Sequence, residues 1–448
     1  MAEEAYRLPR KGTGVMESVF HLTERGTNVK TEIMAGITTF MTMAYIIFVN
    51  PSILQNAGVP FTGAVTATAL AAGIMSIVMG LASNMPLALA SGMGLNALLT
   101  FGVVIGMKLP WQTAMGIVFV EGLIITVLVL TRIREKIMDA IPMSLKMAIG
   151  VGIGLFIAFI GLKEAGIVVA DQATTVKMGS FLSPGVILSF IGLMITGILM
   201  AKRVNGSILL GIIATAAIGF LFGITKLPSS WTAKAVDFST MFQLDIWGAL
   251  RYSLIATIFA FMISDFFDTM GTVVSVSGQA GLLDKTGKPP QLRNILFVDS
   301  LAAMVGGLFG ASSVTTYIES ASGVGAGGRT GLTSVVTGLL FLAAVLLTPI
   351  AGIVPAQATA PALILVGFLM MSVIKDIPFG EFEESIPAFL TLIAIPLTYS
   401  ISNGIGIGFI SYVLIKVFAG KAKDIHPLMW VAALIFAINF TDVLRLLA

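Results

Sequence analysis

Long apolar runs separated by short polar breaks fill the chain from Lys30 onward. Between Glu32 and Lys108 no charged residue occurs, and this stretch has room for three membrane helices of about 20 residues each. The breaks carry turn residues, as at Asn84-Met85-Pro86 and Gly287-Lys288-Pro289-Pro290. The pattern predicts fourteen spans, at 31–54, 62–83, 86–104, 111–131, 143–162, 183–202, 205–224, 250–275, 291–311, 313–327, 330–350, 356–375, 386–401 and 403–419.

The composition agrees with an all-α polytopic membrane protein. Of the 448 residues 56% are hydrophobic and 11% charged, whereas soluble domains average about 45–50% apolar and about 25% charged residues. A soluble enzyme, a nucleic-acid-binding protein and a disordered chain are therefore excluded. Cysteine is absent, and His21 and His426 lie outside the apolar runs. We accordingly expect no metal site, no cofactor and no histidine proton relay.

Residues 1–30 are polar and mixed in charge, without the apolar core that a signal peptide needs. They are expected to form a cytoplasmic N-terminal segment. With this orientation, 19 lysine and arginine residues fall in cytoplasmic loops, 6 fall in outer loops, and Arg445 is unassigned. This excess follows the positive-inside rule and predicts a multi-pass protein of the cell membrane.

Two short sequence echoes predict a duplicated unit. Ala90-Ser91-Gly92-Met93-Gly94 recurs as Ala321-Ser322-Gly323-Val324-Gly325, each near the third span of a seven-span half. Residues 183–223, with a break at Val204-Asn205-Gly206, resemble residues 385–420, with a break at Ser402-Asn403-Gly404. Because seven is odd, the second half must enter the membrane from the opposite side. Such inverted repeats are common in transporters and place the substrate site at their interface.

Spans 3 and 10 are expected to be discontinuous, each with a short extended segment before a half-helix. The extended segments are Pro86-Leu87-Ala88-Leu89 and Val314-Thr315-Thr316-Tyr317, and the glycines that follow permit a sharp change of backbone direction. Unpaired backbone at this depth is tolerated only where it is buried in protein or lines a cavity. The alternative is a continuous helix whose glycines allow close packing.

Five acidic residues fall inside the predicted spans, where charges are costly and usually functional: Glu121, Asp265, Asp268, Asp299 and Glu319. Asp265 and Asp268 are three residues apart, so they share one helix face at about 5 Å. Glu121 and Asp299 are expected to be buried carboxyls hydrogen-bonded to a neighbouring helix. Asp268 and Glu319 are ligand candidates, and no basic residue is expected in range of them. Their natural partner is a neutral ligand with N–H donors, or a proton, since a desolvated carboxyl favours its protonated form.

A family resemblance is carried by four motifs. Residues 36–51, Gly-Ile-Thr-Thr-Phe-Met-Thr-Met-Ala-Tyr-Ile-Ile-Phe-Val-Asn-Pro, resemble the first span of AzgA-like purine permeases, a branch of the nucleobase transporters related to uracil permease and the nucleobase–ascorbate family. Residues 91–97, 268–272 and 315–320 are similar to the same branch. The resemblance runs from about Met16 to Gly420.

This resemblance implies fourteen spans in two inverted repeats. Spans 1–4 (31–131) and 8–11 (250–350) would form a core domain, and spans 5–7 (143–224) and 12–14 (356–419) a gate domain. The segment 427–445 would be an extra C-terminal helix, on the surface or across the membrane. The implied activity is proton-coupled uptake of hypoxanthine, guanine or adenine by elevator-like alternating access. A homodimer through the gate domain follows only by analogy.

The resemblance also implies site residues. Glu319 matches the glutamate that hydrogen-bonds the base, and Asp268 matches the acidic residue of the eighth span. Asn96 and Gly94 match the third span, and the predicted binding set is completed by Thr42, Tyr317, Ser320 and Thr272. The proton is expected on Asp268, with Asp265 able to exchange roles with it, or on Glu319.

Two other kinds of transporter remain as alternatives. A uracil- or xanthine-type permease is disfavoured because Ser320 follows Glu319 where uracil permeases have asparagine, and because the first span lacks histidine. A sulfate-type anion carrier of the same fold would favour a basic residue between the two half-helix N-termini, where this chain has acids. An ion channel needs repeated polar rings along a pore, and the sequence shows none. Aromatic residues available to stack on a base are Phe40, Phe266, Phe267 and Tyr317.

Overall fold

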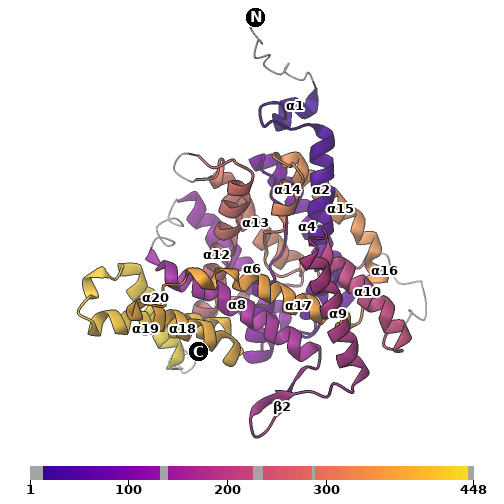
Figure 1. Ribbon diagram of the computed structural model, residues 1–448. Helices are drawn as coiled ribbons and strands as arrows, with labels where there is room; N and C mark the ends of the chain where they lie inside the picture. The colour runs from indigo at the N-terminus through magenta and orange to yellow at the C-terminus, as the bar shows by residue number, and fades with distance from the viewer. Residues whose placement is uncertain (1–13, 132–139, 226–235, 285–287, 442–448) are drawn as a thin grey trace, which may run out of the picture.

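The computed structural model describes residues 14–131, 140–225, 236–284 and 288–441, and most of them are helical (Figure 1). The first half contains, in order, α1 (Val15–Phe20), α2 (Val29–Met43), α3 (Ile46–Gln55), α4 (Phe61–Ser83), β1 (Leu89–Ser91), α5 (Met93–Ala97), a π-helix η1 (Leu98–Gly106), α6 (Trp111–Leu130), α8 (Met143–Glu164), β2 (Val168–Asp171), β3 (Thr175–Met178), α9 (Pro184–Ala201) and α10 (Ser207–Leu221).

The second half follows the same plan. It contains α11 (Ile246–Ala249), α12 (Ile255–Gln279), α13 (Leu292–Phe309), β4 (Val314–Thr316), α14 (Ser320–Gly325), α15 (Gly331–Ala344), α16 (Thr348–Ala351), α17 (Ala356–Met370), α18 (Phe382–Leu397), α19 (Ile401–Phe418) and α20 (Pro427–Phe440). Short 3-10 helices occupy Tyr252–Leu254, Val345–Leu347, Met371–Asp376 and Ala422–Asp424.

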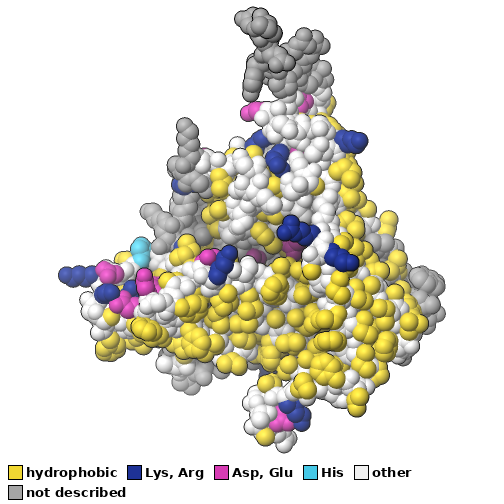
Figure 2. All heavy atoms as spheres, viewed as in Figure 1, with side chains coloured by type: hydrophobic (Ala, Val, Ile, Leu, Met, Phe, Trp, Pro, Cys, Tyr) yellow, Lys and Arg dark blue, Asp and Glu magenta, His cyan; other side chains and the backbone are white. Residues whose placement is uncertain are grey.

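Each of the fourteen predicted spans coincides with a helix or with a strand followed by a helix. Among the described residues, nine helices are long and apolar enough to cross a membrane, and four apolar helices are shorter. Span 1 is divided into α2 and α3 at Ala44 and Tyr45, and span 3 continues as the π-helix to Gly106. A broad apolar surface covers the lower part of the molecule in Figure 2. The protein is therefore a multi-pass membrane protein, and the crossing of the bilayer by all fourteen spans stays a prediction.

The two discontinuous spans meet in a short antiparallel sheet. Strand β1 pairs with β4, with Leu89 opposite Thr316 and Ser91 opposite Val314. All six residues of the two strands are buried. The predicted extended segments are thus confirmed, although β1 begins at the last residue of the segment expected for it. Each strand leads directly toward a helix, α5 after β1 and α14 after β4.

The sequence echoes do not occupy equivalent places in the two halves. Residues 90–94 end β1 and begin α5, whereas residues 321–325 lie wholly within α14. Likewise, residues 204–206 form the turn between α9 and α10, whereas residues 402–404 lie in the first turn of α19. The predicted register of the repeat was therefore wrong. The inverted repeat itself stays a prediction, and the two strands β1 and β4 are the paired elements that its two halves contribute.

Close contact between α4 and α15 holds the two halves of the chain together. A Cβ atom added to Gly331 would lie 1.9 Å from the carbonyl oxygen of Gly80, and one added to Gly338 would lie 2.5 Å from that of Gly73. Small residues allow membrane helices to approach in this way, where packing rather than the hydrophobic effect drives association. The contact joins span 2 of the first half to span 11 of the second.

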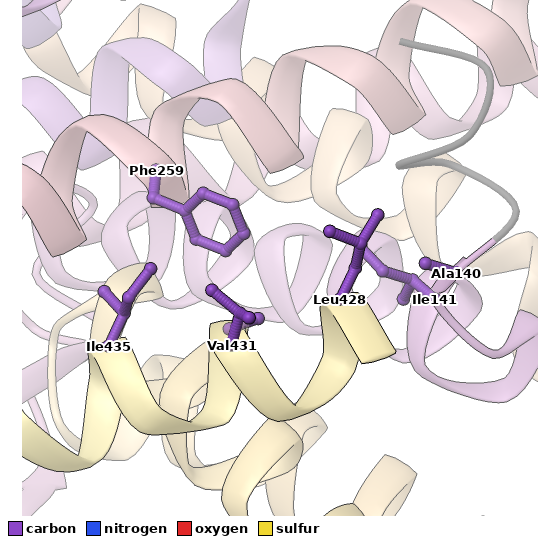
Figure 3. Close-up of a pocket in the computed structure, with 7 residues that line it drawn as sticks. Ala140, Ile141, Phe259, Leu428, Val431 and Ile435 are labelled. Atoms are coloured by element: carbon purple, nitrogen blue, oxygen red, sulfur yellow. The ribbon is translucent and has the colours of Figure 1, made fainter. Parts of the chain in front are cut away.

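Two peripheral elements flank this arrangement. The hairpin of β2 and β3, which the sequence pattern did not predict, lies at the opposite end of the molecule from α1 (Figure 1). An ion pair of 2.7 Å with Lys177 lowers the pKa of Asp171 on this hairpin to about 2. Helix α20 accounts for the apolar segment at 427–445 as far as Phe440. Figure 3 shows its Val431 and Ile435 facing Phe259 of α12 across a small apolar cavity.

A buried carboxylate ties α2 to the beginning of α15. Glu32 has no exposed surface, and its oxygens accept hydrogen bonds from the backbone N–H groups of Arg329, Thr330 and Thr333 at 2.8–3.3 Å. The Thr333 hydroxyl donates to it at 2.6 Å. The first N–H groups of a helix have no partner within that helix. Glu32 therefore satisfies the start of α15 from a distant part of the chain.

We predict that Glu32→Ala lowers the free energy of unfolding by about 3 kcal/mol, since each buried donor left without an acceptor costs about 1–3 kcal/mol. Thermal unfolding of the purified protein in detergent measures the effect. The control is Glu24→Ala, because the Glu24 side chain is 80% exposed and its loss should leave the midpoint unchanged. Equal midpoints for both variants would contradict the assigned capping role.

Candidate functional site

The break after the two-stranded sheet gathers several of the residues predicted from the sequence. Glu319 directly precedes α14, and Asn96 lies in α5. Asp268 lies midway along α12, and a carboxylate oxygen of its side chain is 3.8 Å from the position that a Cβ atom on Gly92 would take. Helix α12 thus brings its acid to the start of the α5 half-helix.

Glu319 is held by a residue that the sequence reasoning did not select. The Tyr45 hydroxyl donates a hydrogen bond of 2.6 Å to Oε1 of Glu319, and Tyr45 is 1% exposed. Ser322 donates to the Glu319 carbonyl at 2.6 Å and lies 2.8 Å from the Thr42 hydroxyl. A buried tyrosine hydroxyl usually has a partner. That rule, applied to the tyrosine within residues 36–51, was the available signal.

Glu319 lines an open cavity of about 390 Å³. Its lining includes Thr42, Glu319 and Ser322, the turn between α9 and α10, and Leu369 of α17. Figure 2 shows a hollow in this face, with basic side chains at its rim and acidic ones inside. Arg203 of the α9–α10 turn lines the same cavity. The expectation that no basic residue lies near the two acids is therefore wrong for Glu319.

The third-span residues differ in their surroundings. Asn96 is fully buried, and within the described chain neither its amide oxygen nor its amide nitrogen has a hydrogen-bond partner. An unpaired buried amide is expensive, so this group is available to a polar ligand. Gly94 instead packs against α8, where an added Cβ atom would lie 2.6 Å from Cγ2 of Ile153. The structure places Gly94 at a helix contact rather than on the cavity wall.

The other acidic residues in the spans differ in burial and in hydrogen bonding. Asp299 is fully buried and accepts hydrogen bonds from the Thr269 hydroxyl at 2.6 Å and the Thr316 N–H at 3.1 Å. The expectation of a hydrogen-bonded structural carboxyl is confirmed for it. Asp265 and Glu121 are also fully buried, whereas Asp268 is partly exposed. Of the pair on α12, Asp268 is the one with some exposed surface.

Other predicted residues support the sheet. The Tyr317 hydroxyl donates to the Ser91 carbonyl, and the Ser320 hydroxyl accepts from the Ala88 N–H at 2.9 Å. Thr272 is buried on α12, one turn beyond Asp268. The residues proposed to stack on a base have partners within the protein. Phe266 is buried in the core, and Phe40 packs edge-to-face on Phe341 with ring centroids 5.1 Å apart. The Lys146 Nζ atom lies 5.7 Å from the centroid of the Phe267 ring, and the Tyr317 hydroxyl is hydrogen-bonded to the Ser91 carbonyl.

Comparisons with known proteins agree with this architecture. The Permease family (Xan_ur_permease) matches residues 30–407. Adenine permease AdeP of Escherichia coli is 43% identical, covering 96% of each chain, and guanine/hypoxanthine permease PbuO of Bacillus subtilis is 44% identical, covering 94% of this chain and 99% of the relative.

The fold is that of a solved transporter. The transmembrane domain of a cyanobacterium bicarbonate transporter, BicA, aligns with a TM-score of 0.65 at 14% identity, covering 84% of this chain and 97% of that domain. At this identity the likeness concerns the fold alone. The match over residues 30–407 and the identity to the two permeases extend over nearly the whole chain. The chain therefore belongs to the Permease family and is a membrane transporter rather than an enzyme.

Proposed function

We propose that this permease carries purine nucleobases into the cell by proton symport, with Glu319 as the residue that binds the base. The observation that carries the proposal is the place of Glu319: a carboxylate at the break of span 10, oriented by Tyr45 and facing a cavity. The relatives named adenine permease and guanine/hypoxanthine permease support the substrate class.

The chemistry of the cavity suits a neutral purine. Hypoxanthine and guanine present ring N–H groups, and guanine adds an amine, so a carboxylate can accept from them. The Thr42 and Ser322 hydroxyl oxygens line the same cavity and can accept hydrogen bonds. Asn96 on α5 is fully buried and offers an amide without a protein partner among the described residues, although it does not line the cavity. A cavity of about 390 Å³ also falls within the range of about 300–1,000 Å³ typical of small-molecule sites.

Asp268 is the proposed proton carrier. It is partly exposed and lies under the electrostatic influence of Asp299 and Glu319. Like charges that share a poorly hydrated site disfavour simultaneous ionisation, and the protons then belong to the coupled group. Protonation of Asp268 from outside would favour loading of the base, and its deprotonation inside would favour release. Asp265, one turn earlier on α12, is the second candidate.

Alternating access is proposed to occur between the core and gate domains. The cavity opens beside the α9–α10 turn, and an aromatic cluster closes the region between η1, α8 and α19. In this cluster Phe101 of η1 packs edge-to-face on Tyr399 and Phe156, with centroids 5.6 and 6.3 Å apart. Tyr399 and Phe156 are 5.0 Å apart. An elevator-like movement of the core would separate Phe101 from these two gate residues.

An anion carrier is the second candidate, because Arg203 lines the cavity and the fold resembles that of a bicarbonate transporter. Glu319, which lines the same cavity, would repel an anion, which favours the neutral base. A uracil- or xanthine-type permease is tested in the same assays by competition between bases.

We predict that Glu319→Gln weakens hypoxanthine binding by about 1.5–3 kcal/mol, the usual contribution of a hydrogen bond to a charged group. Equilibrium binding to the purified protein measures this loss, and Glu24→Gln is the exposed control. Tyr45→Phe should weaken binding less, because it removes only the hydroxyl that orients the carboxylate. Unchanged hypoxanthine affinity in Glu319→Gln would exclude Glu319 as the binding residue.

For proton coupling, we predict that Asp268→Asn still exchanges purine across the membrane but no longer accumulates it along a pH gradient. The amide mimics a permanently protonated carboxyl, so loading persists while the driving reaction is lost. Uptake and exchange of labelled hypoxanthine into proteoliposomes at two pH values separate these effects. Persistent pH-driven accumulation in both Asp268→Asn and Asp265→Asn would place the proton site elsewhere.

Because the natural chain has no cysteine, single-cysteine variants can locate the bound base. Ser322→Cys should react with a soluble thiol reagent through the cavity, and hypoxanthine should protect it. Ser180→Cys, exposed beside the β2–β3 hairpin, should react equally with and without the base. If saturating hypoxanthine leaves the labelling rate of Ser322→Cys unchanged, the base binds elsewhere.

A further inference from the structure

Arg203 occupies an unusual position at the end of α9. Its N–H donates to the Met200 carbonyl at 2.9 Å, and the Val204 N–H donates to the Leu199 carbonyl at 3.0 Å. This is the hydrogen-bond pattern of a helix end whose left-handed residue is usually glycine. Arg203 has that left-handed conformation, with φ 56°. An arginine in this conformation is strained relative to glycine. Eight other described non-glycine residues share the conformation, so what distinguishes Arg203 is its place on the cavity.

The turn that carries Arg203 is fixed close to the wall that carries Glu319. A Cβ atom added to Gly206, at φ 74°, would lie 3.0 Å from the carbonyl oxygen of Met41, which precedes Thr42. Among the described residues Arg203 forms no ion pair with Glu319, whose carboxylate accepts from Tyr45 instead. Arg203 is an exposed residue, and it and Glu319 line the same open cavity.

Arg203 and Glu319 are the charged residues among the described residues that line this cavity. One positive and one negative group give the cavity no net charge, which suits a neutral ligand with both donor and acceptor edges. A guanidinium supplies paired N–H donors in a planar fork that matches two adjacent acceptors. A carboxylate accepts hydrogen bonds only. Arg203 can therefore donate hydrogen bonds to one edge of a planar base while Glu319 accepts them from another edge.

We infer that Arg203 is the specificity-determining residue that selects 6-oxopurines over adenine; this inference rests on the proposed purine transport. Hypoxanthine and guanine carry the O6 and N7 acceptors on one edge, and arginine pairs with those two atoms in a bidentate manner. Their N1–H is the donor that Glu319 accepts. Adenine presents an amine where O6 would be and an unprotonated N1. It therefore opposes donor to donor at Arg203 and acceptor to acceptor at Glu319.

The test exploits the strain at this position. Arg203→Gly places the favoured residue in the left-handed turn, so its thermal stability should equal or exceed that of the natural protein. Arg203→Lys keeps the charge without the fork. Lys202→Ala, at the adjacent exposed residue, is the control. Binding of hypoxanthine, guanine and adenine to each purified variant is measured directly, with sulfate and bicarbonate as competitors.

We expect Arg203→Gly to bind hypoxanthine and guanine about 10- to 100-fold more weakly, the discrimination that a bidentate arginine contact provides. Adenine affinity should stay almost unchanged. Arg203→Lys should lie between, and Lys202→Ala should match the natural protein.

The inference would be overturned, with purine transport left intact, by any of three results: equal losses of affinity for adenine and hypoxanthine, no loss of affinity in Arg203→Gly, or the same loss in Lys202→Ala. A natural protein that binds adenine more tightly than hypoxanthine would also overturn it. Displacement of the base by sulfate or bicarbonate that requires Arg203 would assign the guanidinium to an anion instead. Absence of purine binding in the natural protein would overturn the proposed function itself.

Discussion

The pairing of β1 with β4 is the constraint on which the site depends, because extended backbone in the middle of a membrane protein must find all its partners within the protein. The two strands satisfy each other on their inner edges only. On the outer edge of β1, the Ser76 hydroxyl accepts from the Leu89 N–H at 2.8 Å and donates to its carbonyl at 3.1 Å. On the outer edge of β4, Asp299 accepts from the Thr316 N–H. Helices α4 and α13 thus complete the sheet with one buried side chain each.

These edge contacts also place the residues of the site. Asp299 accepts from Thr269 as well as Thr316, so α12 is held beside β4 at the residue next to Asp268. Glu319 follows β4 and lines the cavity, and the α5 half-helix with Asn96 follows β1. A sheet of six residues thereby brings together groups from three elements that are distant in sequence.

Local patterns predicted the elements, while pairings between distant segments were not visible in the sequence. Apolar periodicity located the spans, and proline and glycine located the breaks at spans 3 and 10. The echo of residues 90–94 in residues 321–325 did not reveal register, since small residues recur in membrane helices for packing reasons. Nothing in the sequence indicated that Arg203 lies near Glu319, because only the folded chain brings the α9–α10 turn to the cavity. Tyr45 could have been selected as a buried tyrosine in need of a hydrogen-bond partner, but its partner Glu319 is distant in sequence.

The buried carboxylates differ in how many hydrogen-bond donors of the protein surround them. Asp299 accepts from two hydroxyls and one backbone N–H, so its oxygens are occupied by immobile donors, which suits a structural role. Glu319 accepts one side-chain hydrogen bond, from Tyr45, and a carboxylate has capacity for several more. That remaining capacity faces the cavity, where a ligand can use it. Asp268 is partly exposed and lies beside the start of α5. These surroundings agree with the proposed division of roles, in which Asp299 is structural, Glu319 binds the base and Asp268 exchanges the proton.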